Sequence, residues 1–235
     1  MISALKLQGD EAILDLGCGD GALTAQLAQL VPDGKVLGID ASAGMIQSAL
    51  QYAGNNLAFA QKDINQMDYD TVFDVIFSNA ALHWVKDHKR LIRHAFRALK
   101  PHGVLIWNFG GEGNCANFLQ VVREAIREER FAQHFQAFEW PWYMPSKVEY
   151  EMLMQQVPFS SVVVTEENAD QYFSDADEMI RWIDQPSLVP FIQCIPDENK
   201  EEFRDAVIQA MLERTLQPNG TCFEIFRRIN VYAVK

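Results

Sequence analysis

The residues with the clearest potential for chemistry lie in the segment DLGCGDG at 15–21, together with an aspartate further along the chain, Asp40. Gly17, Gly19 and Gly21 allow the backbone to turn tightly and to approach a ligand without side-chain obstruction. A helix that begins behind them would offer unpaired amides and the positive end of its dipole. A carboxylate at the end of the next strand can accept hydrogen bonds from two ribose hydroxyls. The spacing therefore predicts a site for an adenosine-containing ligand.

Two classes of adenosine ligand fit such a loop. The run from Gly17 to Ala22 also satisfies the pattern G-x-G-x-x-G/A, so a nicotinamide dinucleotide is one alternative. Asp15, however, places a carboxylate at the tip of the first strand, and Asp63 follows the third strand, where it can accept a hydrogen bond from an adenine amino group. Carboxylates favour a cationic sulfonium amino acid and disfavour an anionic pyrophosphate. The acidic residues therefore indicate a methionyl cofactor.

Alternating strands and helices must position these residues. Apolar residues recur at helical spacing after Asp20, and again after Ser42 and Asp87, which are expected to cap helices. Asn114 is expected to open a further helix, and Pro101 to end the one before it. Apolar runs predict strands at 12–16, 35–39, 57–60, 73–78, 104–109, 161–165 and in the run after the turn at 218–220. The fold class predicted is α/β, a doubly wound, mostly parallel, seven-stranded Rossmann-like sheet with helices on both faces.

The second half of the chain is less regular. Residues 131–160 are dense in aromatic side chains and methionine, and two or three helices are expected across 175–216. We expect one domain over 1–235 with helical and aromatic lid insertions at about 131–160 and 174–218, because ligands bind at the carboxyl ends of the strands and the aromatic segment follows the fifth strand. For any single aromatic side chain, packing in the core is the alternative.

The acidic composition limits the possible partners. The 235-residue chain carries a formal charge of −12, from 20 Lys and Arg against 32 Asp and Glu. Such a field repels phosphate backbones and anionic lipid, which argues against nucleic-acid and membrane partners. The basic residues at 86–100 indicate the solvated face of one helix. Since no secretory signal, long apolar run or C-x-x-C pair is found, we expect a cytoplasmic protein with reduced thiols.

Several of these segments together are similar to the successive motifs of one enzyme family. They are DLGCGDG, LGID at 37–40, QKDI at 61–64 and FDVIFSNAALHWV at 73–85. In these motifs the chain resembles the class I S-adenosylmethionine-dependent methyltransferases. The late stretch from Ile180 to Val207 and the ending FRRINVYAVK resemble the trans-aconitate methyltransferase type, which methylates carboxylates of small molecules. SNAALHWVKDH is also similar to juvenile-hormone-acid methyltransferases and to the malonyl-carrier methyltransferase of biotin synthesis.

The resemblance implies S-adenosylmethionine as the cofactor and a role for each matching residue. Asp15, Gly17 and Gly19 would hold the methionyl part, with Cys18 and Gly21 in the same loop; Asp40 would bind the ribose, with Ala41 and Met45 near the adenosine; Asp63 and Ile64 would border the adenine; Asn79 and Ala80 would face the donor methyl group. Family members usually carry a helix before the first strand, whereas only residues 1–11 precede AILDL here. Two alternatives follow: the sequence is a truncated gene model, or the cofactor pocket is more open than in the family.

The acceptor site is expected just past the fourth strand. There, Trp84 would shape the pocket and His83 would bind or orient the acceptor; the alternative is a core tryptophan with a neighbouring histidine. The other expected substrate-binding residues are Trp140, Trp142 and Arg181.

Three arginines could hold an acidic acceptor. They are Arg181 and the pair Arg227 and Arg228, whose side chains point to opposite faces of a strand, so that at most one of the pair faces the pocket. A solvated surface position is the alternative for each. His83 and His88 share no helical face with a third ligand, so no metal site is predicted.

The motifs of hydrolases, P-loop proteins and zinc proteases are absent from the sequence. Methyl transfer to a carboxylate needs no base, because this acceptor is already ionised at neutral pH; positioning and exclusion of water can supply the acceleration. We therefore expect O-methylation of a carboxylate of a small organic acid. The alternatives are methylation of carbon or a hydroxyl with His83 as the catalytic base, a nicotinamide-dependent oxidoreductase, and a non-catalytic module that binds S-adenosylmethionine.

Overall fold

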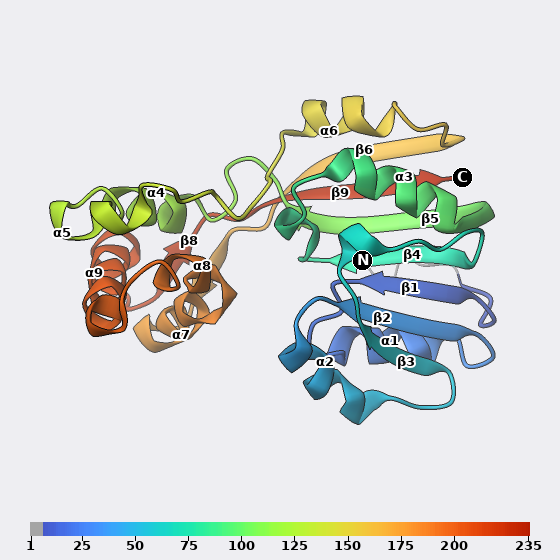
Figure 1. Ribbon diagram of the computed structural model, residues 1–235, viewed down its shortest axis with the longest axis horizontal. Helices are drawn as coiled ribbons and strands as arrows, with labels where there is room; N and C mark the ends of the chain where they lie inside the picture. Colours follow the sequence, from blue (N-terminus) through green and yellow to red (C-terminus); the bar gives the residue numbers. More distant parts are fainter. Residues whose placement is uncertain (1–6) are drawn as a thin grey trace. The chain divides into compact units, whose positions relative to one another are not determined.

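The computed structural model describes residues 7–235 and divides the chain into two compact units (Figure 1). Unit 1 comprises the described residues up to Glu112, Trp142–Glu167 and Arg228–Lys235. Unit 2 comprises Gly113–Pro141 and Asn168–Arg227. These bounds differ from those of the expected lids, because residues 142–160 belong to unit 1. The sequence predicts no helix in residues 1–11, before the first strand. Residues 1–6 of this segment lie outside the described residues.

Unit 1 is built on the seven-stranded sheet that the sequence predicts. Its order is β3-β2-β1-β4-β5-β9-β6. The pairs β1–β2, β1–β4, β2–β3 and β4–β5 are parallel, and β9 runs antiparallel to β5. The bounds are β1 (Ala12–Leu16), β2 (Lys35–Asp40), β3 (Leu57–Gln61), β4 (Phe73–Asn79), β5 (Leu99–Gly110), β6 (Ser161–Asn168) and β9 (Arg227–Val234). The mostly parallel, doubly wound architecture is thus confirmed.

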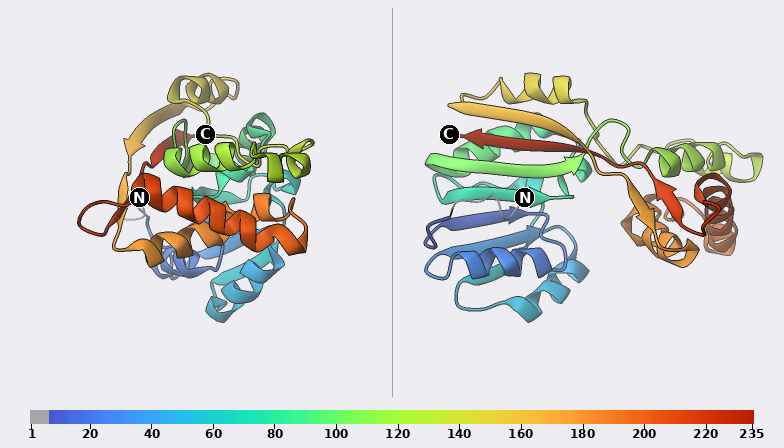
Figure 2. Two further views of the ribbon diagram at one scale, coloured as in Figure 1. Left: turned by 90° about the vertical axis from the view of Figure 1, so that its left-hand side faces the viewer. Right: turned by 180° about the vertical axis from the view of Figure 1, so that it is seen from behind.

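Two apolar cores lie on the two faces of this sheet, because successive strand residues point to opposite sides. Leu14 of β1 packs in the core that includes α3 (His88–Ala98), whereas Ile13 packs in the core that includes α1 (Ala22–Leu30). The two views in Figures 1 and 2 show α3 and α1 on opposite faces. Unit 1 also contains α2 (Ala43–Ala49) and α6 (Lys147–Met154).

Two of the three helix starts predicted from short-range patterns, those at Ser42 and Asp87, are confirmed. Ser42 accepts a hydrogen bond from the Met45 amide at 3.3 Å, and Asp87 accepts one from the Arg90 amide at 2.9 Å. The expected stop at Pro101 is wrong, because α3 ends at Ala98 and β5 begins at Leu99. The register between β4 and β5 shifts between Leu99 and Val104, so the proline lies in a stretch of the strand without regular pairing.

Unit 2 contains α4 (Ala116–Ala125), α5 (Glu129–Ala132), α7 (Ala176–Trp182), α8 (Val189–Ile192), α9 (Asp197–Thr215) and the strand pair β7 (Gln171–Phe173) and β8 (Cys222–Glu224). Its core is aromatic: the rings of Phe131 and Phe203 lie 5.0 Å apart, and those of Phe118 and Trp182 lie 5.6 Å apart. Among the described residues, no helix has the length and apolar character needed to span a membrane.

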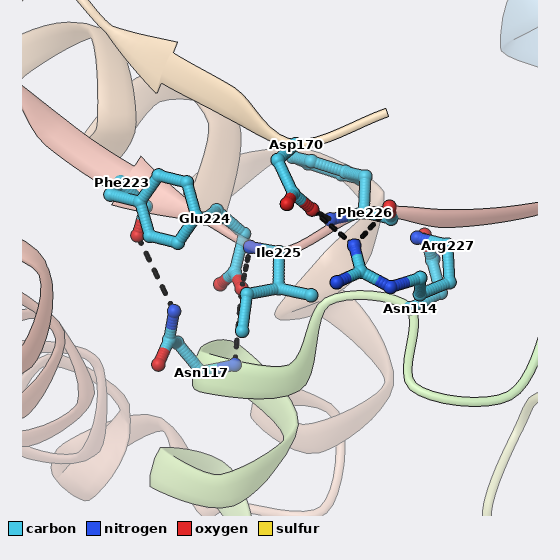
Figure 3. Close-up of polar contacts among 8 residues, drawn as sticks. All are labelled: Asn114, Asn117, Asp170, Phe223, Glu224, Ile225, Phe226 and Arg227. Atoms are coloured by element: carbon cyan, nitrogen blue, oxygen red, sulfur yellow. Dashed lines mark hydrogen bonds and ion pairs between the residues drawn. The ribbon is translucent and has the colours of Figure 1, made fainter. Parts of the chain in front are cut away.

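The expected helix start at Asn114 is wrong. α4 begins after Cys115, and a side chain distant in sequence caps it (Figure 3). The carboxylate of Glu224 accepts hydrogen bonds from the amides of Asn117 and Phe118, at 3.0 and 2.9 Å. The side chain of Asn114 accepts instead from the Arg227 amide at 3.1 Å. Because Glu224 already supplies the acceptor, the helix needs no local cap.

Candidate functional site

At two positions of the glycine loop after β1, the structure has room only for glycine. Gly17 and Gly21 have left-handed φ angles of 73° and 82°. A Cβ at Gly17 would lie 2.2 Å from the Cβ of Ala81, and a Cβ at Gly21 would lie 2.8 Å from that of Ala49. A Cβ at Gly19 would meet nothing within 4 Å. The loop is thus packed below and open at its tip, which fits a ligand that lies against its backbone.

Asp40 fastens the tip of this loop to the end of β2. Its Oδ2 accepts a hydrogen bond from the Gly19 amide at 3.1 Å, and its Oδ1 accepts one from the Ser42 amide at 2.8 Å. A carboxylate has room for about four hydrogen bonds, so each oxygen retains accepting capacity. This donor set fits the ribose of an adenosine cofactor; the ribose role itself stays a prediction.

Asp15, which the resemblance assigns to the methionyl part of the cofactor, is a buried carboxylate at the end of β1. The residue is 2 % exposed, and its Oδ2 accepts a hydrogen bond from the Thr24 hydroxyl at 2.7 Å. Burial raises the pKa of this carboxyl from 3.8 to about 7, although the Thr24 hydrogen bond favours the ionised form. Burial and the nearby carboxylates of Asp15 and Asp40 also raise the pKa of the Cys18 thiol to about 12, which makes it an unreactive thiol.

The buried Asp15 carboxyl predicts a stability that falls as pH rises. Because the folded state binds the proton more tightly than the unfolded state, the free energy of unfolding is expected to drop between pH 4 and pH 7, by up to about 1.4 kcal/mol per pH unit, and to level off above. Chemical denaturation at a series of pH values measures this drop. Asp15→Asn should remove it, and Thr24→Val, which deletes the hydrogen bond to the ionised form, should extend it to higher pH. A wild-type slope that persists in Asp15→Asn would contradict the assignment.

The residues expected around the adenosine lie at the neighbouring strand ends. Asp63 uses Oδ1 to accept from the amide and side chain of Asn65, at 2.8 and 2.9 Å, which caps the short turn η3 (Ile64–Gln66). Ile64 is buried, whereas Ala41 and Met45 are exposed beside Asp40. The contact of Asp63 with an adenine stays a prediction.

The turn after β4 lies against the glycine loop. Asn79 and Ala80 are exposed, and Ala80 has a left-handed φ of 57°. The Ala80 amide donates to the backbone carbonyl of Asn108 at 2.7 Å, which holds this turn to the end of β5. A side chain at Gly17 would collide with Ala81, the residue after Ala80. The turn and the glycine loop are therefore in contact, and they border one site.

His83, Trp84 and Trp142 lie together just past this turn. The His83 and Trp84 rings are 5.8 Å apart, and the Trp84 and Trp142 rings are 5.4 Å apart, edge to face. The Tyr143 amide donates to the His83 carbonyl at 2.8 Å. The structure therefore brings together three of the residues that the sequence assigns to the acceptor.

The imidazole of His83 is held neutral. Burial, then the charge of Arg228 and then His88, lower its pKa from 6.5 to about 3. Its Nδ1 is fully buried and has no hydrogen-bond partner among the described residues. Only Nε2 is therefore left to contact a substrate.

His88 supports this region from below, a role that the sequence does not reveal. Its Nε2 lies 2.9 Å from the Leu82 carbonyl and its Nδ1 2.9 Å from the Tyr150 hydroxyl. A carbonyl only accepts, so Nε2 carries the proton and Nδ1 accepts from Tyr150. Burial lowers the pKa of His88 to about 4. The histidine thus fixes the start of η4 (Leu82–Trp84).

The arginines expected to hold an acidic acceptor occupy different places. Arg227 forms an ion pair with Asp170 within unit 2 (Figure 3). Arg228 pairs with Gly110 across β9 and β5 in unit 1, and its charge acts on His83. The two neighbouring arginines therefore act on different groups, Arg227 on Asp170 in unit 2 and Arg228 on His83 in unit 1.

Trp140 and Arg181 belong to unit 2. The Trp140 ring packs against Phe191 at 5.6 Å and lies under the Arg123 guanidinium, 4.8 Å from the ring centroid. Arg181 is exposed on α7, where its charge acts on the carboxylates of Asp175 and Glu178. The packing of Trp140 matches the core alternative; an acceptor role for either residue stays a prediction.

Comparisons with known proteins point in one direction. A profile of the family described as methyltransferase domain matches residues 7–138. The trans-aconitate 2-methyltransferase of Deinococcus radiodurans is 31% identical over 228 residues, which cover 95% of this chain and 86% of that protein. The enzyme of the same name from Escherichia coli O1:K1 is 27% identical over 234 residues, 99% of this chain and 90% of that protein.

Solved structures share the fold. The YcgJ protein of Bacillus subtilis has a TM-score of 0.67 at 18% identity, and the match covers 100% of this chain and 96% of that chain. A phosphoethanolamine N-methyltransferase of Haemonchus contortus, solved with S-adenosylhomocysteine, has a TM-score of 0.60 at 19% identity, over 97% of this chain and 49% of that chain. At these identities the likeness concerns the fold.

Proposed function

Because the chain belongs to the methyltransferase domain family, and is an S-adenosylmethionine-dependent methyltransferase of the trans-aconitate 2-methyltransferase type, we propose that it methylates a carboxylate oxygen of a small organic acid. The relatives' name supports an organic acid as the acceptor class. S-adenosylmethionine, when bound, supplies an electrophilic methyl group on a sulfonium centre. The glycine loop, Asp40 and the turn at Asn79 and Ala80 would hold it, because their open backbone and accepting oxygens suit a cationic adenosine ligand.

The observation that carries the proposal is the state of His83. A carbon or hydroxyl acceptor needs a general base near the donor methyl group. For His83 to serve, Nε2 would need a free lone pair, so the proton would sit on Nδ1, buried without an acceptor, at a cost of about 1–3 kcal/mol. The other tautomer leaves only an unpaired lone pair at Nδ1, which is the more tolerated defect. His83 is therefore suited to donate from Nε2 to an ionised oxygen.

Two neighbouring features suit a carboxylate acceptor. Arg228 carries a positive charge whose field reaches His83, in a chain with a formal charge of −12 that would otherwise repel an anion. Trp84 and Trp142 offer apolar ring surface beside it. Rings that exclude water strengthen the attraction between the acceptor and the cation. A carboxylate held there would need only to be aligned with the methyl group.

Product analysis tests the proposal directly. The purified enzyme is incubated with labelled S-adenosylmethionine and a panel of small organic acids that includes trans-aconitate. We expect a methyl ester, identified by mass spectrometry and NMR and cleaved by mild alkali. A product methylated on carbon, nitrogen or a hydroxyl would refute carboxylate methylation and leave the cofactor assignment intact.

Variants of His83 separate a hydrogen-bond donor from a base. His83→Gln, whose amide can still donate, should retain activity within about threefold, and His83→Ala should lose about tenfold, the value of one hydrogen bond to a charged group. Loss of a general base would instead cost about 10²–10⁴-fold in both variants. We also expect the ratio of kcat between the wild type and His83→Ala to be constant between pH 6 and 9, because a neutral histidine does not titrate there and the Asp15 carboxyl is common to both proteins. His134→Ala, in unit 2, is the control.

A further inference from the structure

Three polar side chains form a continuous row across β5, β9 and β6. Asn108 Nδ2 donates to Asn230 Oδ1 at 2.7 Å, and Asn230 Nδ2 donates to Glu167 Oε2 at 3.1 Å. Asn108 and Asn230 are direct partners in the antiparallel pairing of β5 with β9. Each interrupts an otherwise apolar run, VLIWNF in one strand and INVYAV in the other. None of the roles described above involves these three side chains.

The carboxylate at one end fixes the direction of the whole row. An ionised carboxylate only accepts, so Asn230 must turn its amide nitrogen toward Glu167 and its carbonyl oxygen toward Asn108. Asn108 must then turn its own nitrogen toward Asn230. If either amide turned over, two donors or two acceptors would face one another. The Oδ1 of Asn108 is therefore presented on the side away from Asn230, as an acceptor.

This acceptor lies at the cofactor end of the sheet. Asn108 is in register with Asn79, the last residue of β4, on a neighbouring strand about 4.8 Å away. Its backbone carbonyl holds the Ala80 turn, which packs against Gly17 through Ala81. Because side chains alternate along a strand, Asn108 lies on the same sheet face as Ile106. Ile106 packs against the apolar core that contains residues of α1 and β1, so Asn108 lies on the face of the sheet that α1 covers at β1.

Side chains of β9 and β6 beside the row are exposed. In the view from behind in Figure 2, α1 lies over the β1–β2 side of the sheet, and no described helix of unit 1 lies over β5, β9 and β6. Tyr232 of β9, two residues beyond Asn230, is 46% exposed, and Val163 of β6 is 51% exposed. A ligand group can therefore reach the row from this side.

We propose that Asn108 Oδ1 accepts a hydrogen bond from the ammonium group of the cofactor's methionyl part, with Asn230 and Glu167 as positioning residues. Of the groups expected at this edge, the acceptor carboxylate has no proton to donate, whereas the ammonium group has three. The negative charge of Glu167 polarises the row toward Asn108 and strengthens its oxygen as an acceptor. The inference rests on the proposed function for the cofactor alone and does not depend on which atom of the acceptor is methylated.

Binding of two ligands by calorimetry, without any methyl acceptor, tests this role. S-adenosylhomocysteine carries the ammonium group, and 5′-methylthioadenosine lacks it. Asn108→Ala should weaken binding of S-adenosylhomocysteine about tenfold and leave 5′-methylthioadenosine within twofold of the wild type. Glu167→Gln touches no ligand, yet it should weaken S-adenosylhomocysteine about threefold, because the row can then run in either direction. Glu166→Gln, an exposed neighbour that accepts from the Lys147 amide, is the matched control.

A reversed row is the sharper test. Asn108→Asp combined with Glu167→Gln moves the carboxylate to the other end, so Asn230 turns over and position 108 still presents an accepting oxygen. Binding of S-adenosylhomocysteine should return at least to the wild-type value. Unchanged binding in Glu167→Gln and Asn108→Ala, or equal losses for both ligands, would overturn the proposal, since equal losses indicate only a structural role. Because Glu167 is exposed, its variant tests the idea even if Asn108→Ala does not fold.

Discussion

Replacing Asp40 with alanine is expected to weaken binding of S-adenosylhomocysteine ten- to a hundredfold. The variant loses the acceptor for two ribose hydroxyls, and hydrogen bonds to a charged group contribute about 1.5–3 kcal/mol. It also releases the Gly19 amide, which Asp40 holds at 3.1 Å, so the tip of the glycine loop loses its fastening to β2. Since both effects act on the same ligand, a loss near the upper end of this range is expected.

Calorimetric titration measures this loss, and the melting temperature checks the fold. Asp40 lies half-buried at a strand end, outside the apolar core, so only a small change in melting temperature is expected. Asp20→Ala is the matched control, because Asp20 is an exposed aspartate of the same loop. An Asp40→Ala protein that binds S-adenosylhomocysteine as tightly as the wild type would remove Asp40 from the cofactor site.

Replacing Glu224 with alanine is expected to destabilise unit 2 by on the order of 4 kcal/mol, because one buried and two partly buried amides lose their acceptor, and a fully buried amide without a partner costs about 1–3 kcal/mol. Glu224 is fully buried, and its two oxygens accept from the amides of Asn117 and Ile225 at 3.0 and 2.7 Å (Figure 3) and from the amide of Phe118 at 2.9 Å. Two of these amides form the first turn of α4, where the helix dipole favours a negative charge. The variant therefore loses the cap of α4 and its link to β8 together.

Hydrogen exchange at the amides of Asn117 and Phe118 reports this change locally, and chemical denaturation reports its size. Both amides should lose protection in Glu224→Ala, and Glu224→Gln, which keeps one accepting oxygen, should show a smaller loss. Glu213→Ala on α9 is the control, because Glu213 is exposed and accepts only from the Gln209 side chain among the contacts described. Full protection of Asn117 and Phe118 in Glu224→Ala would show that another group caps α4.

Short-range patterns in the sequence determined the parallel sheet, the glycine loop and two helix caps. Ser42 and Asp87 accept from amides three residues away, and the glycines of DLGCGDG set the backbone of their own turn. Such features depend on residues close in the chain, so their spacing is enough to predict them. The cofactor class followed from the same few residues.

The tertiary structure alone decided burial, long-range pairing and hydrogen-bond direction. Asp15 could be placed at the end of β1 from its position in the sequence, but only the packing of α1 buries it beside Thr24. The cap of α4 comes from Glu224, far along the chain, so a local pattern could not identify it. The polarity of Asn108 depends on Glu167 through a strand that lies last in the sequence. Interactions of this kind join residues whose proximity is created only when the sheet forms, and no spacing along the chain encodes them.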